Sequence, residues 1–489
     1  AQLYNFEYRY AAEEFRRAQE ADPDFVMAYW GEAMTHNHAL WKRQEKEDAL
    51  KALDKLAPDA KSRTTLATTE IEKDFMRSLE VLYGEGTKYD RDIAYKDFMK
   101  GLTEKYPDQH EVSAFYAVSL LGSSRNGRDD ELYGKSAKIA ESIIKENANH
   151  PGALHYLIHS YDDPVHAHLA RQAADRYSKV APDAAHALHM PSHIYVAQGN
   201  WDEVVKSNIA SWNASVKRKE RKELGPKSRS YHALNWLQYG LLERGEVEQA
   251  TRLVHDMIKY AEEDDRTQAL DYLVAMKGAH MVETNSWSGE IADIEIDLDD
   301  LYITKKAGHN YLEGMKAYHK NDAKAVAAII SDMEKDRVKA SLTVGEKGFA
   351  MCSSGSNSKK PASQIDIDMA EIMEMELEAY LATLNGNLAD AKKWFKKATD
   401  LDESLNYSFG PPLILKPVHE AFGEWLLEQN QLEEAYQVFE KSLNRHPRRL
   451  LSLQGQRKAA LELKKESAIA KIDKELEISL ASRERPEVL

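Results

Sequence analysis

Residues 8–34 read YRYAAEEFRRAQEADPDFVMAYWGEAM, and this stretch decides the fold class. Ala11, Phe15 and Ala18 recur at helical spacing, and Pro23 follows shortly after them. The small residues let two helices approach closely, and the aromatic ring fills the groove between them. Proline then ends one helix, because it cannot continue a helix and disfavours helix in the residue before it. The stretch therefore predicts a helical hairpin.

The same pattern returns along the chain, each time behind a Gly or Asn turn. The copies are DEVVKSNIASWNAS from Asp202, GEVEQATRLVHDMIKYA from Gly245, NDAKAVAAIISDMEK from Asn321, GNLADAKKWFKKATDLDES from Gly386 and NQLEEAYQVFEKSLNRHP from Asn430. At roughly 34 to 45 residues a repeat, they predict an all-α, right-handed superhelix of about eleven hairpins. The one alternating segment, ADIEIDLDDLYI (292–303), is interpreted as irregular and acidic, because it carries no convincing strand pattern.

Length and composition limit the class of protein. A chain of 489 residues exceeds one compact core, so several domains or an elongated array are expected. The formal net charge of −15 argues against non-specific nucleic-acid binding. No run of 18 apolar residues occurs, so no membrane span is expected. The single cysteine, Cys352, allows no internal disulfide or thiolate zinc site, and we interpret it as inert.

Three breaks divide the predicted array: basic residues 217–230, acidic residues 288–305 and the Ser/Gly/Lys-rich loop 353–364, which we expect to be flexible. We place a soft boundary near residue 304. Residues 1–303 would form a superhelix that carries the histidines, and residues 304–489 a run of plainer repeats. The opening AQLYNFEYRY resembles the end of a helix, so the first helix is expected to be incomplete. Cytoplasmic, periplasmic and secreted locations all stay open.

The repeats resemble tetratricopeptide repeats over most of the chain. Four motifs are more particular: DPDFVMAYWGEAM (22–34), HPGALHYLIHSYDDP (150–164), APDAAHALHMPSHIYVAQGNW (181–201) and FGPPLILKPVHEAFGEWLLE (409–428). They are similar to a family of long bacterial repeat proteins that is distantly related to the eukaryotic tetratricopeptide repeat protein 38. This resemblance implies a fold and a site, and it implies no reaction.

Residues 150–212 hold eight of the chain's 18 histidines, among them two HxxxH pairs. Residues four apart lie on one face of a helix, and neighbouring inner-wall helices stand roughly 8–10 Å apart. We therefore predict that His155, His159, His189 and His193 meet as ligands of one divalent metal ion. Neutral imidazole suits zinc, copper, nickel and iron(II), and we expect zinc, copper or iron.

Pro191 stands inside the second HxxxH pair and bears on this prediction. A proline there either kinks one helix or marks the first turn of a new one. If a helix begins at Pro191, His189 becomes a cap-side residue, and we expect the geometry of the pair to be lost.

Further residues of the inner wall are expected to contribute. As additional ligands, or as groups that orient an imidazole, we predict Glu111, Asp162, His186 and His232. As residues lining the groove we predict Tyr29, Trp30, His36, Tyr116 and Trp236, with simple packing as the alternative for the aromatic ones. His36 and His38 form a lesser site or a solvated helix end. Residues 409–425 form either a stiff turn between repeats or a lid over the histidines.

Three functions remain open. The first is a binding or scaffold protein whose concave groove holds a metal ion and takes a peptide, protein or small-molecule ligand. The second is a metal-dependent enzyme in which the same histidines leave one coordination position open, and Glu111 or a nearby aspartate moves protons. The third is a plain scaffold without metal. Binding ranks first, because the sequence holds no Gly-rich phosphate loop, GxSxG, HExxH or CxxC motif.

Overall fold

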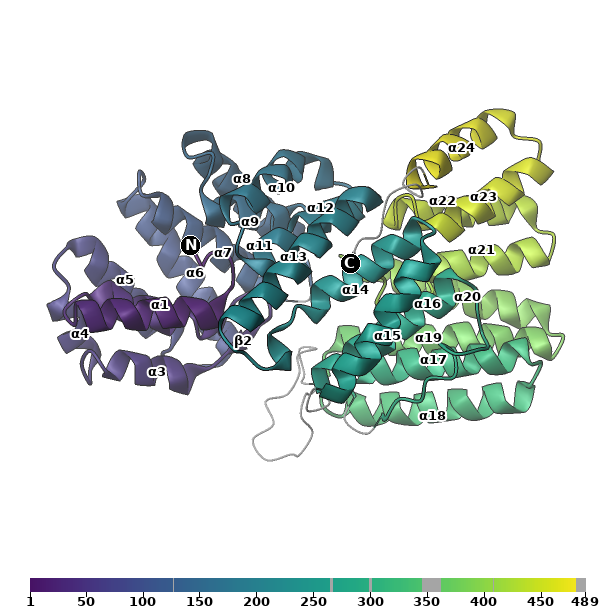
Figure 1. Ribbon diagram of the computed structural model, residues 1–489, viewed down its shortest axis with the longest axis horizontal. Helices are drawn as coiled ribbons and strands as arrows, with labels where there is room; N and C mark the ends of the chain where they lie inside the picture. Colours follow the sequence, from purple (N-terminus) through teal and green to yellow (C-terminus); the bar gives the residue numbers. More distant parts are fainter. Residues whose placement is uncertain (126, 264–266, 299–300, 345–361, 408, 481–489) are drawn as a thin grey trace. The chain divides into compact units, whose positions relative to one another are not determined.

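The computed structural model describes residues 1–125, 127–263, 267–298, 301–344, 362–407 and 409–480 (Figure 1). Within these ranges the regular secondary structure is almost entirely α-helical, and consecutive helices pack side by side as hairpins (Figure 1). The predicted fold class, an all-α solenoid of the tetratricopeptide type, is therefore confirmed. Two compact units make up the chain, and they divide after Ile194.

The first unit is built from short helices joined by tight turns. They are α1 (Tyr8–Ala21), α2 (Val26–Met34), α3 (Lys46–Asp54), α4 (Ala60–Leu66), α5 (Glu70–Leu82), α6 (Lys88–Lys105), α7 (His110–Ser123), α8 (Asp130–Glu146), α9 (Pro151–Ser160), α10 (Ala167–Val180), α11 (Ala185–His189) and α12 (Pro191–Ala197), of which α12 runs on into the second unit. One small antiparallel pair, β1 (Asn37–His38) with β2 (Arg43–Gln44), follows α2. Residues 2–6 form turns, whereas the sequence suggested the end of a helix there.

The second unit continues the hairpins with longer helices. They are α13 (Trp201–Arg221), η1 (Pro226–Ser228), α14 (Tyr231–Glu243), α15 (Val247–Glu263), α16 (Thr267–Glu283), α17 (Ile303–His319), α18 (Ala323–Ser341), α19 (Gln364–Leu384), α20 (Leu388–Ser404), α21 (Val418–Glu428), α22 (Leu432–Arg445), α23 (Leu450–Glu462) and α24 (Glu466–Leu480).

The hairpin packing that the repeat pattern predicts is visible in α1 and α2. Phe15 projects from α1 onto Gly31 of α2, where a Cβ atom would lie 2.1 Å from the phenyl ring. The same device recurs in the second unit, where the Phe439 ring would lie 2.2 Å from a Cβ at Gly455. Glycine is therefore needed at these positions because an aromatic ring occupies the space of its missing side chain.

The predicted breaks have different outcomes. Residues 288–298 form turns and irregular chain, as expected for the acidic segment, and α17 begins at Ile303. The basic segment 217–230 is not a linker throughout, because α13 continues through Arg221. Its basic side chains suit this position, since cations are favourable in the last turn of a helix.

The predicted domain boundary near residue 304 falls inside the second unit, at the beginning of α17. Of the predicted loop 353–364, residues 353–361 lie outside the described residues, and Cys352 does as well. Ser363 caps α19: its hydroxyl accepts a hydrogen bond from the backbone N–H of Asp366.

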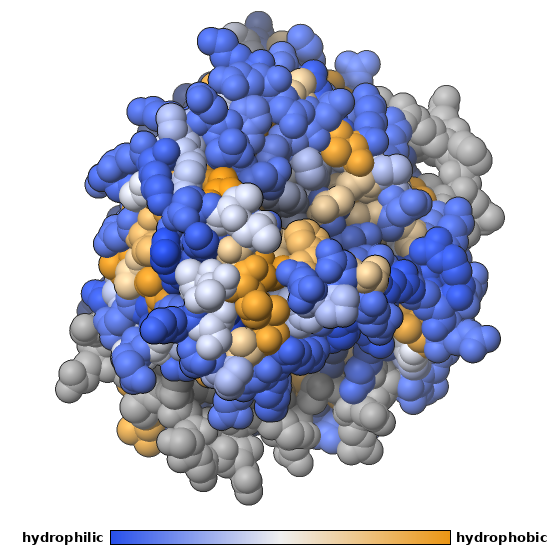
Figure 2. All heavy atoms as spheres, turned by 90° about the vertical axis from the view of Figure 1, so that its left-hand side faces the viewer, coloured by the Kyte–Doolittle hydropathy of each residue, from blue (hydrophilic) through white to orange (hydrophobic). Residues whose placement is uncertain are grey.

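The surface agrees with the charged composition. The face drawn in Figure 2 is mainly hydrophilic, with apolar side chains gathered near its centre. Among the described helices, none is long and apolar enough to cross a membrane.

A buried charge cluster lies in the second unit, around the residue that precedes α23. The Arg449 guanidinium, with no exposed surface, donates to Glu420 at 2.8 and 2.9 Å. It also pairs with Glu243 at 3.2 Å and with Glu283 at 2.7 Å. The Tyr239 hydroxyl accepts a further hydrogen bond of 2.9 Å. Three carboxyl groups thus share one guanidinium.

The three carboxyl groups differ in how readily they ionise. Burial opposes ionisation of Glu420, but Arg449 and Lys416 beside it hold its pKa at about 2. Burial, only partly offset by Arg449, raises the pKa of Glu283 to about 8. The pKa of Glu243 is also raised, again mainly by burial. The cluster therefore keeps a proton at neutral pH.

We expect the second unit to lose stability as the pH rises from about 6.5 to 8. Glu283 keeps its proton over this range in the folded unit, whereas its ordinary pKa of 4.5 leaves it ionised in the unfolded chain. One retained proton corresponds to about 1.4 kcal/mol per pH unit, and the loss is complete above the folded pKa. Urea unfolding across this range measures the slope. Glu283→Gln should flatten it by that amount, and an unchanged slope in this variant contradicts the assignment.

Candidate metal centre

Helix α9 carries the first HxxxH pair, and local capping fixes where it begins. The His150 imidazole accepts a hydrogen bond of 3.1 Å from the Ala153 N–H, and Pro151 occupies the first turn, where no backbone N–H is needed. His155 and His159 are 0% and 6% exposed. The pair is therefore inside the first unit and not on its surface.

The second HxxxH pair spans a break in the helix. Helix α11 ends at His189 and α12 begins at Pro191. Met190 between them has helical angles, φ −51° and ψ −37°. The Nε2 atoms of His189 and His193 still lie 3.2 Å apart. The expected loss of pair geometry is therefore wrong, because a proline in the first turn removes only an N–H that the turn does not use.

Three imidazoles come together from α9 and α11. His155, His159 and His186 each offer one nitrogen, and these atoms lie within 4.8 Å of one another. The Nε2 atoms of His155 and His186 are 3.2 Å apart. We call these three residues the histidine trio.

The protonation of the trio follows from burial and hydrogen bonding. Burial lowers the pKa of His155 and of His186 well below the ordinary value, so both rings are neutral at pH 7. His155 Nδ1 lies 2.6 Å from the Tyr4 carbonyl oxygen, which can only accept a hydrogen bond. The proton of His155 is therefore on Nδ1, and its Nε2 presents a lone pair toward His186.

Asp162, in the turn after α9, holds two further rings in place. Its Oδ2 atom lies 3.5 Å from His159 Nδ1 and 3.3 Å from His193 Nδ1. Its Oδ1 atom pairs with Arg128 at 3.3 Å. Burial opposes ionisation of Asp162, but the two imidazoles keep its pKa below the ordinary value. An ionised Asp162 thus orients both rings so that their Nε2 atoms point away from it.

His159 has one polar atom that nothing satisfies. Its Nε2 is buried and has no hydrogen-bond partner among the described residues. An unpaired buried polar atom costs on the order of 1–3 kcal/mol, so it normally has a protein, water or metal partner. Because Asp162 contacts Nδ1 of the same ring, Nε2 is the nitrogen of His159 that stays available to bind an ion together with His155 and His186.

Aromatic rings from three parts of the first unit pack against the trio. The Phe6 ring centre lies 4.3 Å from that of His155, and the Tyr177 ring stacks on His155 at 5.3 Å. The ring centre of Trp41, which is 54% exposed, lies 6.0 Å from that of His186.

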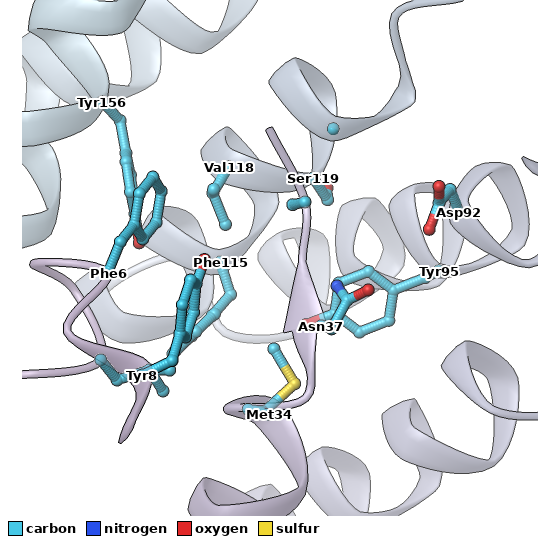
Figure 3. Close-up of a pocket in the computed structure, with 13 residues that line it drawn as sticks. Phe6, Tyr8, Met34, Asn37, Asp92, Tyr95, Phe115, Val118, Ser119 and Tyr156 are labelled. Carbon is cyan, nitrogen blue, oxygen red and sulfur yellow. The ribbon is translucent and has the colours of Figure 1, made fainter. Parts of the chain in front are cut away.

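A small cavity of about 30 Å³ lies beyond Phe6. Figure 3 shows Phe6, Tyr8 and Tyr156 on one side of this cavity and Asp92 and Tyr95 on the other. Its size suits a water molecule and not a substrate.

Two predicted additional ligands have partners other than the trio within their own units. Glu111 accepts a hydrogen bond from the Tyr4 hydroxyl and lies 3.5 Å from His150 Nε2. It therefore contacts Tyr4 and His150 and not the trio. His232 belongs to the second unit, where its Nδ1 is 3.3 Å from the Tyr272 hydroxyl.

The predicted groove-lining residues are mostly interior. Tyr29, Trp30 and Trp236 are 7%, 5% and 2% exposed, which fits the packing alternative. Tyr116 is half-buried on α7. His36 Nδ1 lies 3.1 Å from Glu45 and, with Asp48, offers a more exposed group of three ligand atoms.

Two contributors were not predicted from the sequence. The Tyr4 carbonyl is a backbone atom, 151 residues away from the ring it holds, and no sequence pattern marks it. Arg128 stands beside Asp129 and Asp130 in a charged loop, which gives no sign that it pairs with Asp162.

The stacked helical hairpins define the fold class, an α-solenoid of the tetratricopeptide type. No protein family and no curated protein matches the sequence. Among solved structures, human IFIT1 in a dimer with m7Gppp-AAAA matches 98% of this chain and 92% of its own at 12% identity and a TM-score of 0.39. Yeast Tom70 matches 97% and 90% at 13% identity and a TM-score of 0.32. Ypp1 matches 93% and 64% at 12% identity and a TM-score of 0.34. Because these identities and TM-scores are low, the fold assignment rests on the helical hairpins of the chain itself.

Proposed function

We propose that this chain is a repeat-type binding protein whose first unit holds one divalent transition metal ion on His155, His159 and His186. Two imidazole nitrogens bound to one zinc ion at about 2.0–2.1 Å, with tetrahedral angles, stand about 3.3–3.4 Å apart. The separation of 3.2 Å between His155 Nε2 and His186 Nε2 fits this spacing. Zinc, copper and iron(II) are among the ions that neutral imidazoles suit.

The observation that carries the proposal is the unpaired Nε2 of His159. His155 and His186 could satisfy each other through one N–H···N hydrogen bond, as in a plain scaffold without metal. That arrangement leaves the buried His159 Nε2 without a partner. A metal ion bound to all three nitrogens gives each of them a partner, and the Nδ1 contacts of His155 and His159 are the outer contacts that ligating histidines usually make.

We rank binding first and catalysis second, because the chain carries no decisive acid/base or nucleophile motif. A metal-dependent enzyme is the second candidate, because three protein ligands leave a coordination position open, as catalytic zinc sites do. The binding role would use a peptide, protein or small-molecule ligand, and the net charge of −15 disfavours nucleic acid. The finer resemblance to bacterial relatives of tetratricopeptide repeat protein 38 belongs to this proposal and adds no reaction to it.

Metal binding by the purified protein tests the proposal. After chelation and dialysis, we expect the chain to take up about one equivalent of zinc that His155→Ala/His186→Ala does not bind. At a free zinc concentration of 100 times Kd, the first unit should gain about 2.7 kcal/mol of stability. His168→Ala, which removes an exposed histidine of the same region, is the matched control and should bind like the wild type.

Uptake below about a tenth of an equivalent, or equal uptake by the double variant, contradicts a metal role for the trio. Cobalt(II) in place of zinc then separates the two candidates. A visible spectrum that changes when an anion is added indicates an exchangeable fourth ligand and favours the enzyme. A spectrum insensitive to anions favours a closed site and the binding role.

A further inference from the structure

The second unit contains a larger pocket that the metal proposal does not use. It has a volume of about 340 Å³, within the range of ligand sites, and side chains of α17, α19, α21 and α23 line it. All of these helices belong to the second unit. The pocket is therefore a separate candidate for ligand binding.

Aromatic rings form one wall of this pocket. The rings of Tyr318 and Tyr380 meet at 4.7 Å, and Trp287 stacks on His319 at 5.2 Å. Such rings attract a cation placed over their faces.

Carboxylates stand on α21 beside the aromatic wall. Glu424 is 38% exposed and pairs with Lys416 at 2.6 Å. Lys416 also pairs with Glu420 at 3.1 Å, so its single charge is divided between two carboxylates. Glu428, one turn beyond Glu424, forms no ion pair or hydrogen bond with another described residue. Lys416 is thus shared between two carboxylates, and Glu428 stands beside the aromatic wall without an ion-pair partner among the described residues.

A buried acid lies beneath the pocket. Glu376 on α19 is fully buried, and neither of its carboxyl oxygens has a hydrogen-bond partner among the described residues. Lys416 and Arg449 are buried cations of this interior, and the Arg449 cluster contains three carboxyl groups, of which Glu283 keeps its proton at neutral pH. Lys458 also lines the pocket but is exposed at its edge.

A buried hydroxyl sets a second requirement for the ligand, in addition to a positive charge. Tyr311 lines the pocket with no exposed surface, and its hydroxyl has no hydrogen-bond partner among the described residues. A buried hydroxyl normally donates to an acceptor. A ligand that completes this site therefore brings a hydrogen-bond acceptor together with its positive charge.

We propose that this pocket binds a peptide segment through an arginine or lysine side chain. The cation lies between Trp287 or Tyr318 and the carboxylates of α21, and the Tyr311 hydroxyl donates to a main-chain carbonyl of the peptide. A polyamine meets the first requirement but not the second, because it has no strong acceptor. This proposal is independent of the metal site.

A labelled, capped peptide of alternating alanine and arginine is the probe, and fluorescence anisotropy is the measurement. We expect saturable binding that weakens at least about tenfold in Glu424→Gln/Glu428→Gln. Lys458→Gln should strengthen binding, because it removes a competing cation. A peptide with glutamine in place of arginine should bind no more than a tenth as tightly.

Two further variants keep the test decisive. Asp332→Asn/Glu334→Gln removes two exposed acidic groups of α18, away from the pocket lining, and should leave affinity unchanged. An equal loss in this control would show attraction to the net charge and overturn the site. Trp287→Leu, on a half-buried aromatic ring, should weaken the arginine peptide even if the α21 variant fails to fold.

Tyr311→Phe separates a peptide from a polyamine. It should weaken the arginine peptide and leave spermidine binding unchanged. If the glutamine peptide binds as tightly as the arginine peptide, or if Tyr311→Phe and Trp287→Leu both leave the arginine peptide unaffected, the proposal is overturned.

Discussion

Replacing Arg449 by methionine should lower the free energy of unfolding of the second unit by about 3–5 kcal/mol. The guanidinium is fully buried, and it pairs with Glu243, Glu283 and Glu420 at 3.2, 2.7 and 2.8 Å. Methionine has a similar length and fills the space, so the loss reports the carboxyl groups left without a cation. Urea unfolding followed by circular dichroism measures it.

Two comparisons interpret this loss. Arg457→Met removes a 39% exposed arginine that pairs with Asp473, and surface pairs contribute at most about 1 kcal/mol. Adding Glu243→Leu and Glu420→Leu to Arg449→Met should recover most of the stability, because an apolar core can replace a buried charge cluster. A loss below about 1 kcal/mol in Arg449→Met alone would show that the cluster is not the determinant of stability that its burial indicates.

Asp162→Asn is expected to weaken zinc binding by the histidine trio about 10- to 100-fold. The carboxylate accepts a hydrogen bond of 3.3 Å from His193 Nδ1 and lies 3.5 Å from His159 Nδ1. A neutral amide removes the charge that holds both rings, and its NH₂ group cannot accept a hydrogen bond. Competition with a chromophoric chelator gives the zinc affinity of each variant.

Asp163→Asn is the matched control. Asp163 is buried like its neighbour and also pairs with Arg128, at 2.8 Å, but its other partners are His166 and the backbone of the turn. We expect its loss to cost stability and to leave zinc affinity within about threefold of the wild type. Equal losses of affinity in the two variants would mean that the turn as a whole, and not Asp162, orients the imidazoles.

The fold could be read from the sequence because its determinants are local. The close contact of Phe15 with Gly31 lies within one hairpin, so residue spacing alone reveals it. The position of the break after Ile194 was not predicted, since it depends on packing among helices that are distant in sequence. The proline-rich entrance to α21 gave no sign that Glu420 ends in a buried cluster with Arg449.

The histidine site was only partly predictable, because it depends both on local spacing and on packing between separate helices. The HxxxH spacing grouped His189 with His193, and their Nε2 atoms do meet. The structure brings His186, and not that pair, to His155, because helices α9 and α11 lie close in space. Which ring nitrogen faces inward depends on acceptors such as the Tyr4 carbonyl, and these are absent from any residue pattern.

A single oxygen of Asp162 serves rings from α9 and from α12. His159 belongs to the trio and His193 to the neighbouring pair, so the two groups are thermodynamically linked. An ion that fixes His159 also restrains the shared oxygen and, through it, His193. If an ion bound to the trio changes the affinity of the pair for a second ligand by some factor, that ligand changes the affinity of the trio for the ion by the same factor. This follows because linkage between two binding sites is reciprocal.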